Sequence, residues 1–329
     1  MVGIGKALAA AIAQGEEARG HTSPNPPVGA AILDRNGVLV GTGRTQPAGG
    51  PHAEVMALRE AGERAEGGTA VVTLEPCNHT GRTGPCSQAL LDAGVDTVHY
   101  CQPDPNPQAT GGAQFLRENG VNAECLDHEV EALVPWLTAV RRNRPSVTLK
   151  FAQTLDGFTA ALDGSSQWIT GPEARRHVHG DRSRRDAIII GTGTAIADNP
   201  SLTARDGDRE LPVQPRRVVI GGRSLTGHAG NLHRLGFEQY RGIPEALWRL
   251  WDTGARDVLV EGGAHLASGF VEAGLVDHIQ AYVAPALLGQ GRSVLTEAVG
   301  LSIDDALRFR TRRVVQLDDD VLIEMTRKD

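Results

Sequence analysis

Hydrophobic residues along the first 140 positions alternate between the spacing of helices and the spacing of strands. Ile4, Ala7, Leu8, Ala11 and Ile12 form one stripe and predict an amphipathic opening helix. Short apolar runs bounded by turn residues predict strands at 28–33, 38–42, 69–74, 95–100 and 121–125. Helical segments separate them, beginning near His52 and covering 87–93, 114–119 and roughly 127–140. This alternation predicts an α/β/α sandwich.

A charged segment that contains a proline, RRNRP at 141–145, interrupts the pattern and predicts a domain boundary. We therefore divide the sequence into domains 1–145 and 146–329. Apolar runs at 147–152, 187–190, 218–220, 258–260 and 279–283 predict buried strands of a second, β-rich α/β domain. Two further strands are predicted within 311–325, around an acidic turn at 318–320 that we expect to be solvated. Residues 225–246 show little periodicity.

The composition is that of a globular protein, with 40% hydrophobic and 22% charged residues. A length of 329 residues also favours two domains. The net charge of −7 argues against a nucleic-acid-binding surface, which needs a basic face. The chain has no run of 18 apolar residues, no signal-peptide pattern, and too few cysteines for a disulfide framework. We therefore expect a cytoplasmic protein without a membrane partner.

Three short segments carry side chains suited to a zinc site: HAE beginning at His52, a proline–cysteine pair ending at Cys77, and Cys86. One imidazole and two thiolates are soft ligands that leave the fourth position of a catalytic zinc open for water. Glu54 is placed to take a proton from that water and to pass protons to the ring and the leaving amine. The combination predicts a zinc-dependent deaminase of an amino-substituted pyrimidine.

Two alternatives to a catalytic site stay open on these residues alone. The second cysteine follows Cys77 after eight intervening residues rather than the two of the short deaminase signature. A histidine and a glutamate two positions apart also occur by chance, and the cysteines can be buried thiols. His79 offers a fourth ligand, which would make the zinc structural.

In the second half, two buried strands run into glycine turns, GTGT at 191–194 and EGG at 261–263. Such turns can present backbone N–H groups to a phosphate, but each is also an ordinary strand-to-helix connection. Neither matches the G-x-G-x-x-G fingerprint of dinucleotide-binding folds. These residues alone do not decide a function for this half.

The segment EPCNHTGRTGPC at 75–86, together with PNPPVG at 24–29 and GGPHAE at 49–54, resembles the bifunctional riboflavin-biosynthesis deaminase–reductase family. The resemblance continues through KFAQTLDG at 150–157, SSQWIT at 165–170, DNPSLTAR at 198–205 and VEGG at 260–263. It covers nearly the whole chain. One departure is Gly84, where the family usually has proline.

This resemblance implies a cytidine-deaminase-like first domain in which the same histidine and two cysteines hold zinc. It also implies that Asn25 hydrogen-bonds the pyrimidine edge and that His79 and Arg82 face the ribose phosphate. An amide suits an edge with donors and acceptors, and a guanidinium suits a phosphate. The alternatives are that Asn25 is a turn residue and Arg82 a solvated surface charge.

For the second domain, the resemblance implies a dihydrofolate-reductase-like fold that uses NADPH. Residues expected to line the cofactor are Ala152, Trp168, Thr194, Asp198 and Gly263. Residues expected to hold the sugar-phosphate substrate are Ser166, Arg182, Leu202, Arg205 and Glu261. The alternative for the two arginines is that both are surface residues.

Three groups are candidates for proton delivery in the reduction: Lys150, Asp198 and Glu261. Ser224, or Arg223 beside it, is a further candidate for the 2′-phosphate of the cofactor. The segment 225–246 is shorter than the corresponding part that the resemblance to the family implies. Cys101 and Cys125 are expected to be small buried hydrophobes without a chemical role. His177 and His179 are expected to be surface histidines.

We therefore predict two activities of riboflavin biosynthesis on one chain. The first is zinc-dependent hydrolytic deamination of 2,5-diamino-6-ribosylamino-4(3H)-pyrimidinone 5′-phosphate, and the second is NADPH-dependent reduction of its ribosyl group to ribityl. A deaminase of another base with a non-catalytic C-terminal assembly domain is one rival hypothesis. A zinc-stabilised scaffold without catalysis is another. The resemblance also implies a homo-oligomer, either a dimer or a tetramer.

Overall fold

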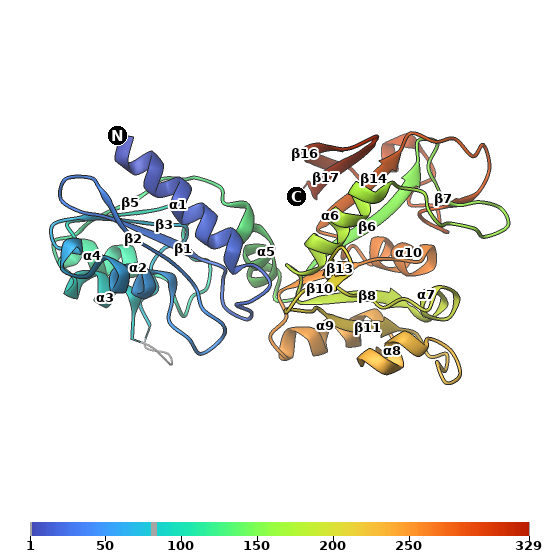
Figure 1. Ribbon diagram of the computed structural model, residues 1–329, viewed down its shortest axis with the longest axis horizontal. Coiled ribbons are helices and arrows are strands. Elements are labelled where there is room, and N and C mark those ends of the chain that lie inside the picture. Colours follow the sequence, from blue (N-terminus) through green and yellow to red (C-terminus); the bar gives the residue numbers. More distant parts are fainter. Residues whose placement is uncertain (1, 80–83, 329) are drawn as a thin grey trace. The chain divides into compact units, whose positions relative to one another are not determined.

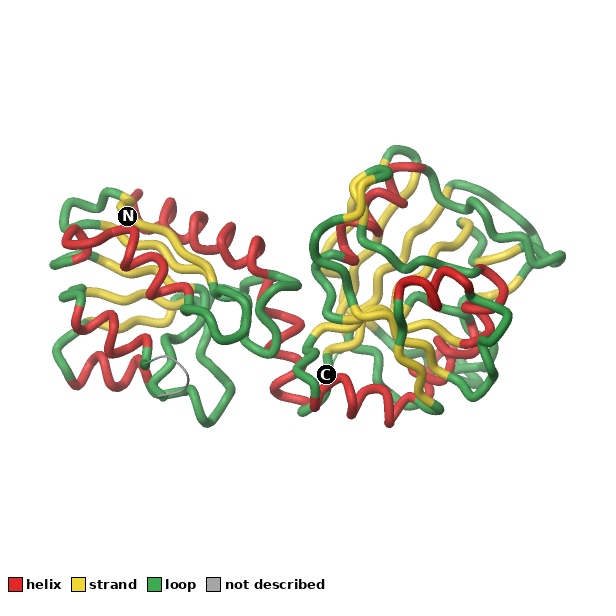
Figure 2. The backbone as a smooth tube through the Cα atoms, turned by 60° about the horizontal axis from the view of Figure 1, so that its bottom comes forward, coloured by secondary structure: helices red, strands yellow, loops and turns green. Residues whose placement is uncertain are grey.

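The computed structural model describes residues 2–79 and 84–328. The chain divides into two compact units, Met1–Asn143 and Arg144–Asp329. Figures 1 and 2 show that each unit has its own central sheet with helices packed on it. Among the described residues, no helix is both long and apolar enough to cross a bilayer.

The first unit is built on a five-stranded sheet in the order β2-β1-β3-β4-β5. Its strands are β1 (Gly29–Leu33), β2 (Leu39–Arg44), β3 (Thr69–Val72), β4 (Thr97–Tyr100) and β5 (Asn122–Cys125). β1 pairs antiparallel with β2 and β3, while β3, β4 and β5 run parallel. Parallel strands need crossover helices, and these supply the second layer of the unit.

Helices cover both faces of this sheet (Figure 1). α1 (Val2–Ala18) lies on one face, and α2 (Ala53–Ala61), α3 (Cys86–Asp92) and α4 (Gly112–Glu118) lie on the other. The last helix of the unit, α5 (Val134–Arg142), follows a 3-10 turn at Glu131–Leu133, so it is shorter than the predicted helix at 127–140. Two helical layers around a sheet give the predicted α/β/α arrangement.

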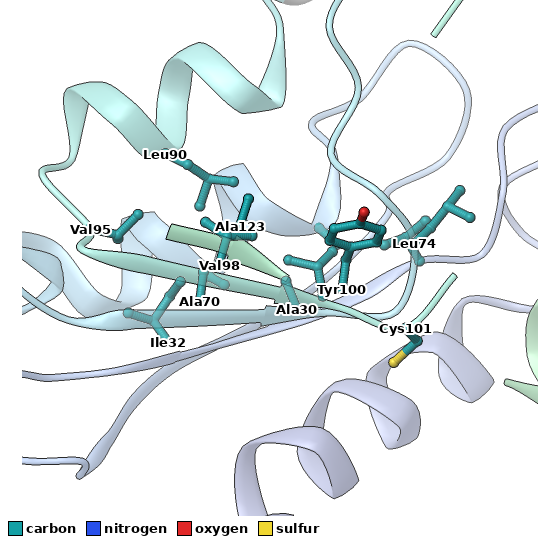
Figure 3. Close-up of a cluster of buried hydrophobic side chains, with 14 of the residues drawn as sticks. Ala30, Ile32, Ala70, Leu74, Leu90, Val95, Val98, Tyr100, Cys101 and Ala123 are labelled. Carbon is teal, nitrogen blue, oxygen red and sulfur yellow. The ribbon is translucent and has the colours of Figure 1, made fainter. Parts of the chain in front are cut away.

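Small residues set how closely the helices approach the sheet. A Cβ atom on Gly41 or Gly43 of β2 would lie 2.3 Å from a backbone oxygen of α2, and one on Gly29 would lie 1.9 Å from Ala11 O. Only glycine permits such close approach of backbones. The core between the sheet and the helices α2–α4 consists mainly of alanine, valine and leucine. Figure 3 shows Ala30, Ile32, Ala70, Leu90 and Val98 in this cluster.

The second unit contains an eight-stranded sheet in the order β12-β11-β8-β13-β6-β14-β17-β16. The six strands β12 (Glu238–Tyr240), β11 (Arg216–Ile220), β8 (Ala187–Gly191), β13 (Asp257–Val260), β6 (Ser146–Thr154) and β14 (His278–Ala284) are parallel. β17 (Asp320–Arg327) and β16 (Phe309–Leu317) add an antiparallel edge. Two separate antiparallel pairs consist of short strands: β9 (Arg205–Asp206) with β10 (Arg209–Glu210), and β7 (Phe158–Ala160) with the distant β15 (Arg292–Ser293).

Alternate residues of the central strands bury opposite faces of this sheet. Ile189 packs with α9 (Ile243–Asp252) and α10 (Ala264–Glu272), whereas Ile188 and Ile190 pack with α7 (Thr192–Asp198) and α8 (Gly230–Leu235). α6 (Pro172–Arg182) packs on Tyr282 of β14 and Leu322 of β17. A strand buried on both faces has to be apolar throughout, which is why the sequence AIII at 187–190 predicts a buried strand.

The segment 225–246 is better ordered than its sequence indicated. It contains α8, the edge strand β12 and the start of α9. α8 has six residues and β12 has three. Elements this short do not repeat a hydrophobic spacing often enough for the sequence to show it.

Candidate functional site

The structure brings His52, Cys77 and Cys86 together in the first unit. His52 Nδ1 lies 3.6 Å from the sulfur of Cys77 and 3.3 Å from the sulfur of Cys86. All three ligand atoms lie within 4.8 Å of one another. An imidazole nitrogen and two sulfurs at this spacing match the donor set of a three-ligand zinc site. The predicted ligands therefore form one cluster.

Two helix starts and one loop position these ligand atoms. His52 is the N-cap residue of α2, and Cys86 is the first residue of α3. The Cys86 N–H points at the Cys77 sulfur over 3.5 Å, and the Ser87 N–H donates to the Cys77 carbonyl. A thiolate at a helix N-terminus is stabilised by the free N–H groups there. The loop that carries Cys77 is therefore fastened to the start of α3.

Glu54 stands in the first turn of α2, two residues after the histidine ligand, and is buried. Burial and the nearby Cys77 sulfur raise the pKa of its carboxyl to about 7. The hydrogen bond from Cys86, reinforced by His52, lowers the pKa of Cys77 to about 4. A buried carboxyl beside a cluster of metal ligands is placed as the prediction for Glu54 requires.

Glu75 has a part in this site that the sequence analysis did not assign. Its buried carboxylate accepts hydrogen bonds from the backbone N–H groups of Asp104, Gly111 and Ala113. A Cβ atom at Gly112 would lie 1.8 Å from the Pro76 carbonyl oxygen, so the segment 104–113 presses against the residue before Cys77. The sequence shows that this glutamate precedes a proline–cysteine pair, but its three partners lie 29, 36 and 38 positions away.

The three residues predicted to bind the pyrimidine substrate are placed differently. Asn25 is half-buried, and its backbone is held by Thr22; the Trp136 indole N–H donates to the Pro24 carbonyl and fixes this loop on α5. His79 is exposed and does not join the ligand cluster. Arg82 lies outside the described residues. In the described chain the metal cluster therefore has three protein ligands, which leaves a position for water.

A cavity of about 840 Å³ opens in the second unit at the carboxyl ends of its parallel strands. Open α/β sheets bind their ligands at this edge, and the volume is that of a small-molecule site. Its lining contains all the residues predicted for the reductase site except Ser224, namely Lys150, Ala152, Ser166, Trp168, Arg182, Thr194, Asp198, Leu202, Arg205, Glu261 and Gly263.

Ser224 is exposed and does not line the cavity. Its hydroxyl accepts the Thr226 N–H at 3.2 Å, which is a local turn contact. The neighbouring Arg223 donates to the Thr192 hydroxyl at the start of α7. The structure therefore separates Ser224 from the other predicted cofactor residues.

Two of the charged groups inside the cavity form an ion pair. Arg182 Nε and Nη2 donate to the two carboxylate oxygens of Glu261, each at 2.7 Å. Burial alone would raise the pKa of Glu261, but the guanidinium outweighs it and the pKa lies below its ordinary value. Burial lowers the pKa of Lys150, whose Nζ lies 5.4 Å from the centre of the Tyr282 ring. Asp198 is exposed at the end of α7.

The expectation that His177 and His179 are surface histidines is wrong. His177 Nδ1 bonds to the Tyr282 hydroxyl at 2.8 Å, and His179 Nδ1 bonds to the Thr203 carbonyl at 2.9 Å. Both residues lie on α6 and face β14 or the segment after α7, which only the tertiary packing decides. His179 also lines the cavity.

α6 is anchored at both ends. At its start, the Gly171 N–H donates to a carboxylate oxygen of Asp320 at 2.7 Å. Asp320 is buried, so the prediction of a fully solvated turn at 318–320 holds only for the exposed Asp318 and Asp319. Past its end, Arg185 is buried between Asp181 and Asp257. The helix that carries Arg182 is therefore fixed against the sheet.

The remaining cysteines show one correction. Cys101 is buried as predicted, whereas Cys125 is exposed at the end of β5. β5 is the edge strand of its sheet, so its last residue has no neighbouring strand on one side.

Comparison with known proteins matches both halves of the chain to family models. The model of the RibD C-terminal domain matches residues 145–323, and that of the cytidine and deoxycytidylate deaminase zinc-binding region matches residues 5–102. The chain is 61% identical to the riboflavin biosynthesis protein RibD of Corynebacterium ammoniagenes, with 89% of each chain covered. The chain belongs to the RibD family.

Relatives that span almost the whole RibD chain support this assignment. RibD of Mycobacterium tuberculosis is 46% identical, covering 98% of this chain and 97% of that protein. The solved structure of Acinetobacter baumannii RibD has a TM-score of 0.88 and 37% identity, with 99% of both chains covered. A Thermotoga maritima structure described as a diaminohydroxyphosphoribosylaminopyrimidine deaminase/5-amino-6-(5-phosphoribosylamino)uracil reductase has a TM-score of 0.88 and 30% identity, also over 99% of both chains.

Membership of the RibD family confirms several predictions. The fold is a cytidine-deaminase-like domain followed by a dihydrofolate-reductase-like RibD reductase domain. The chain is a bifunctional enzyme of riboflavin biosynthesis, with a zinc-dependent deaminase and an NADPH-dependent reductase. The rivals that treat the second half as an assembly domain, or the whole chain as a scaffold, are not supported.

Proposed function

We propose that the domain 1–145 deaminates 2,5-diamino-6-ribosylamino-4(3H)-pyrimidinone 5′-phosphate and that the domain 146–329 reduces the ribosyl group of the product to ribityl. The observation that carries the first part is the cluster of His52, Cys77 and Cys86 beside the buried Glu54. The second part is supported by a cavity that contains two arginines, one of them paired with Glu261, and a glycine turn.

In the deaminase site, the imidazole and the two sulfurs are proposed to hold zinc, which supplies polarisation of the attacking water when bound. Glu54 takes the proton from that water and returns protons to the ring nitrogen and to the departing amine. Asn25 orients the pyrimidine edge through its amide, and His79 and Arg82 face the phosphate.

In the reductase site, the residues on both sides of Gly263 are proposed to receive NADPH, which supplies hydride when bound. A Cβ atom at this position would lie 3.1 Å from Thr194 Oγ1, so the glycine keeps the turn open toward α7. Ala152, Trp168 and Asp198 line the same cavity. Ser224 remains a candidate for the adenosine end of the cofactor, away from this cavity.

Among the three candidates for proton delivery, we propose Lys150. Glu261 is held as a carboxylate by two bonds from Arg182, so it is a poor acid. Asp198 is exposed at the end of α7; partial burial raises the pKa of its carboxyl, but the described residues give it no neighbouring anion that would hold it protonated. Lys150 is half-buried, and burial lowers the pKa of its ammonium group, which makes it a better proton donor. Ser166, Leu202 and Arg205 complete the wall of the cavity on the substrate side.

The decisive test of the deaminase proposal is Glu54→Gln. Ammonia release should fall by about 10²- to 10⁴-fold because both proton transfers lose their carrier, while zinc content stays unchanged. Glu60→Gln is the matched control, since Glu60 lies on the same helix but is exposed, and within the described part of the chain it accepts hydrogen bonds from Thr42. Full ammonia release by the Glu54 variant would overturn the proposal.

The reductase proposal is tested separately with the deaminated ribosylaminouracil phosphate and NADPH. Oxidation of NADPH that depends on this substrate, with formation of the ribityl compound, is the expected result. An active deaminase without NADPH oxidation would contradict it and would restore the assembly-domain hypothesis.

We also propose that the chain forms a homo-oligomer and acts in the cytoplasm. Several large apolar side chains of the second unit are exposed, among them Leu287 at 74%, Leu301 at 99% and Ile303 at 77%. Exposed apolar side chains concentrated within twenty residues favour a contact between subunits. Sedimentation of the wild type and of Leu301→Glu tests this; a monomeric wild type would contradict it.

A further inference from the structure

The two arginines of the reductase cavity differ in what their guanidinium groups contact. Arg182 is committed to Glu261 by two bonds of 2.7 Å, and its Nη1 donates to the Thr203 carbonyl at 3.1 Å. Arg205 has no carboxylate partner among the described residues, and its buried Nε lacks any hydrogen-bond acceptor. The charge of Arg182 is therefore neutralised, whereas that of Arg205 is available.

His179 stands between these two arginines. Its Nδ1 lies 2.9 Å from the Thr203 carbonyl oxygen and 3.4 Å from Arg182 Nη1, and its Nε2 lies 3.4 Å from Arg205 Nη2. A carbonyl oxygen can only accept, so Nδ1 must carry the hydrogen. The lone pair of the neutral ring is then on Nε2, where it can accept from Arg205. The contacts of this one ring thus fix its tautomer.

The neutral ring is also the form that its surroundings favour. Burial lowers the pKa of His179, and the charges of Arg182 and Arg205 lower it further, against the Thr203 carbonyl and Glu261. A protonated ring would place a third positive charge beside two guanidinium groups. The ring can therefore act as a hydrogen-bond acceptor for Arg205.

We propose that His179 is a positioning residue of the reductase site. It holds Arg205 in place as the free cation that binds the phosphate of the substrate, while Arg182 stays paired with Glu261. This inference rests on the proposed function, because it takes a phosphorylated ribosylamino compound as the substrate. Because one nitrogen of His179 is bonded to the Thr203 carbonyl, the other nitrogen is held at a fixed position from which it contacts Arg205. The ring itself need not touch the substrate.

The histidine makes two hydrogen bonds, one as a donor to the Thr203 carbonyl and one as an acceptor from Arg205. Asparagine can replace the first of these bonds, and glutamine can replace the second. In His179→Asn, an amide N–H can still reach the Thr203 carbonyl, but no acceptor reaches Arg205. In His179→Gln, the longer side chain can place its carbonyl oxygen near the position of Nε2. A positioning role therefore predicts that the glutamine variant recovers substrate affinity that the asparagine variant loses.

The experiment compares reduction of the 5′-phosphorylated substrate with reduction of its dephosphorylated form, in the full-length zinc-loaded protein. Arg205→Met should raise KM for the phosphorylated substrate by about 10- to 100-fold. His179→Asn should raise it by about 3- to 10-fold, with kcat unchanged. Neither variant should change KM for the dephosphorylated compound, and His179→Asn should add nothing in the Arg205→Met background.

His233→Asn is the matched control. His233 Nε2 also bonds to a backbone carbonyl, that of Leu225, at 3.0 Å, but this residue does not line the cavity. Its substitution should leave KM for both substrates unchanged. Thermal unfolding of each variant shows whether it is folded, and His179→Gln tests the inference if His179→Asn is not.

The outcomes separate the inference from the function beneath it. If the wild type reduces both compounds with the same KM, or reduces neither, the proposed phosphate recognition fails and the inference fails with it. If the wild type prefers the phosphorylated compound and the His179 variants keep that full preference, only the inference is overturned. A loss of kcat without a change in KM would also overturn it.

Discussion

The two sites of this chain use polar side chains in opposite ways. In the first unit, three ligand atoms within 4.8 Å of one another come from two helix starts and one loop, and they converge on one position. In the second unit, a cavity of about 840 Å³ collects its polar groups from β6, α6, α7 and the turn after β13, and two of them, Arg182 and Glu261, neutralise each other.

This difference shows which features of a functional site can be predicted from residue types alone. A metal cluster needs few atoms of particular chemistry, so imidazole and thiolate side chains identify it in a short motif. A large cavity needs a surface, and the role of each side chain depends on which partner neutralises it. Arg182 and Arg205 are the same residue type, yet one is bound to Glu261 and the other is not.

Removal of zinc should separate the two sites most completely. Chelation takes away the group that the three ligands hold, so ammonia release should fall to background. NADPH oxidation should continue, since every residue that lines the second cavity lies between 149 and 294. Parallel assays on the same chelated sample, with zinc added back, make the measurement. A matching loss of NADPH oxidation would show that the sites are not independent.

Lys150→Met should have the next largest effect, confined to the other activity. We expect the reductase kcat to fall by about 10²- to 10⁴-fold and deamination to remain. Because burial lowers the pKa of Lys150, the wild-type rate should fall as pH rises through that pKa, since the acid form is then lost. The pH profile of the variant should lack this limb. Lys328→Met, at an exposed lysine, is the control; an unchanged profile in the Lys150 variant would assign the proton elsewhere.

Glu75→Gln tests the support behind the metal cluster. The carboxylate accepts three backbone N–H groups, and an amide offers one acceptor oxygen in its place. We expect the first unit to lose about 2–3 kcal/mol of stability and to bind zinc more weakly. Denaturant unfolding and zinc titration measure both, with the exposed Glu63→Gln as the control. If zinc affinity is unchanged, Glu75 does not position Cys77.

Asp320→Ala should give the smallest effect, in the second unit. It removes the acceptor for the Gly171 N–H at the start of α6, a loss of about 1 kcal/mol. Urea unfolding followed through the second unit makes the comparison with Asp319→Ala, whose side chain is exposed. Equal stability of the two variants would mean that this bond contributes nothing to the anchoring of α6.

Local patterns predicted the order of the elements well, and their errors have a common cause. The buried strand at 187–190 is apolar throughout and was placed correctly, because both faces of the sheet are covered. α8 and β12 were missed, because six and three residues are too few to show a period. The prediction of solvated side chains is wrong for His177, His179 and Asp320, because a sequence shows charge and polarity but not which surface of a helix or hairpin faces inward.

The sequence by itself determined the chemistry of the deaminase site, the presence of two domains and the family, because residue types at fixed separations specify a donor set and a set of motifs. Tertiary structure alone decided that Glu75 supports the loop of Cys77, that Arg182 is bound to Glu261, and that Ser224 stays outside the cavity. These contacts join residues 36 and 79 positions apart, where Glu75 meets Gly111 and Arg182 meets Glu261. Pairings over such separations depend on how the sheets and helices pack, and no local pattern encodes them.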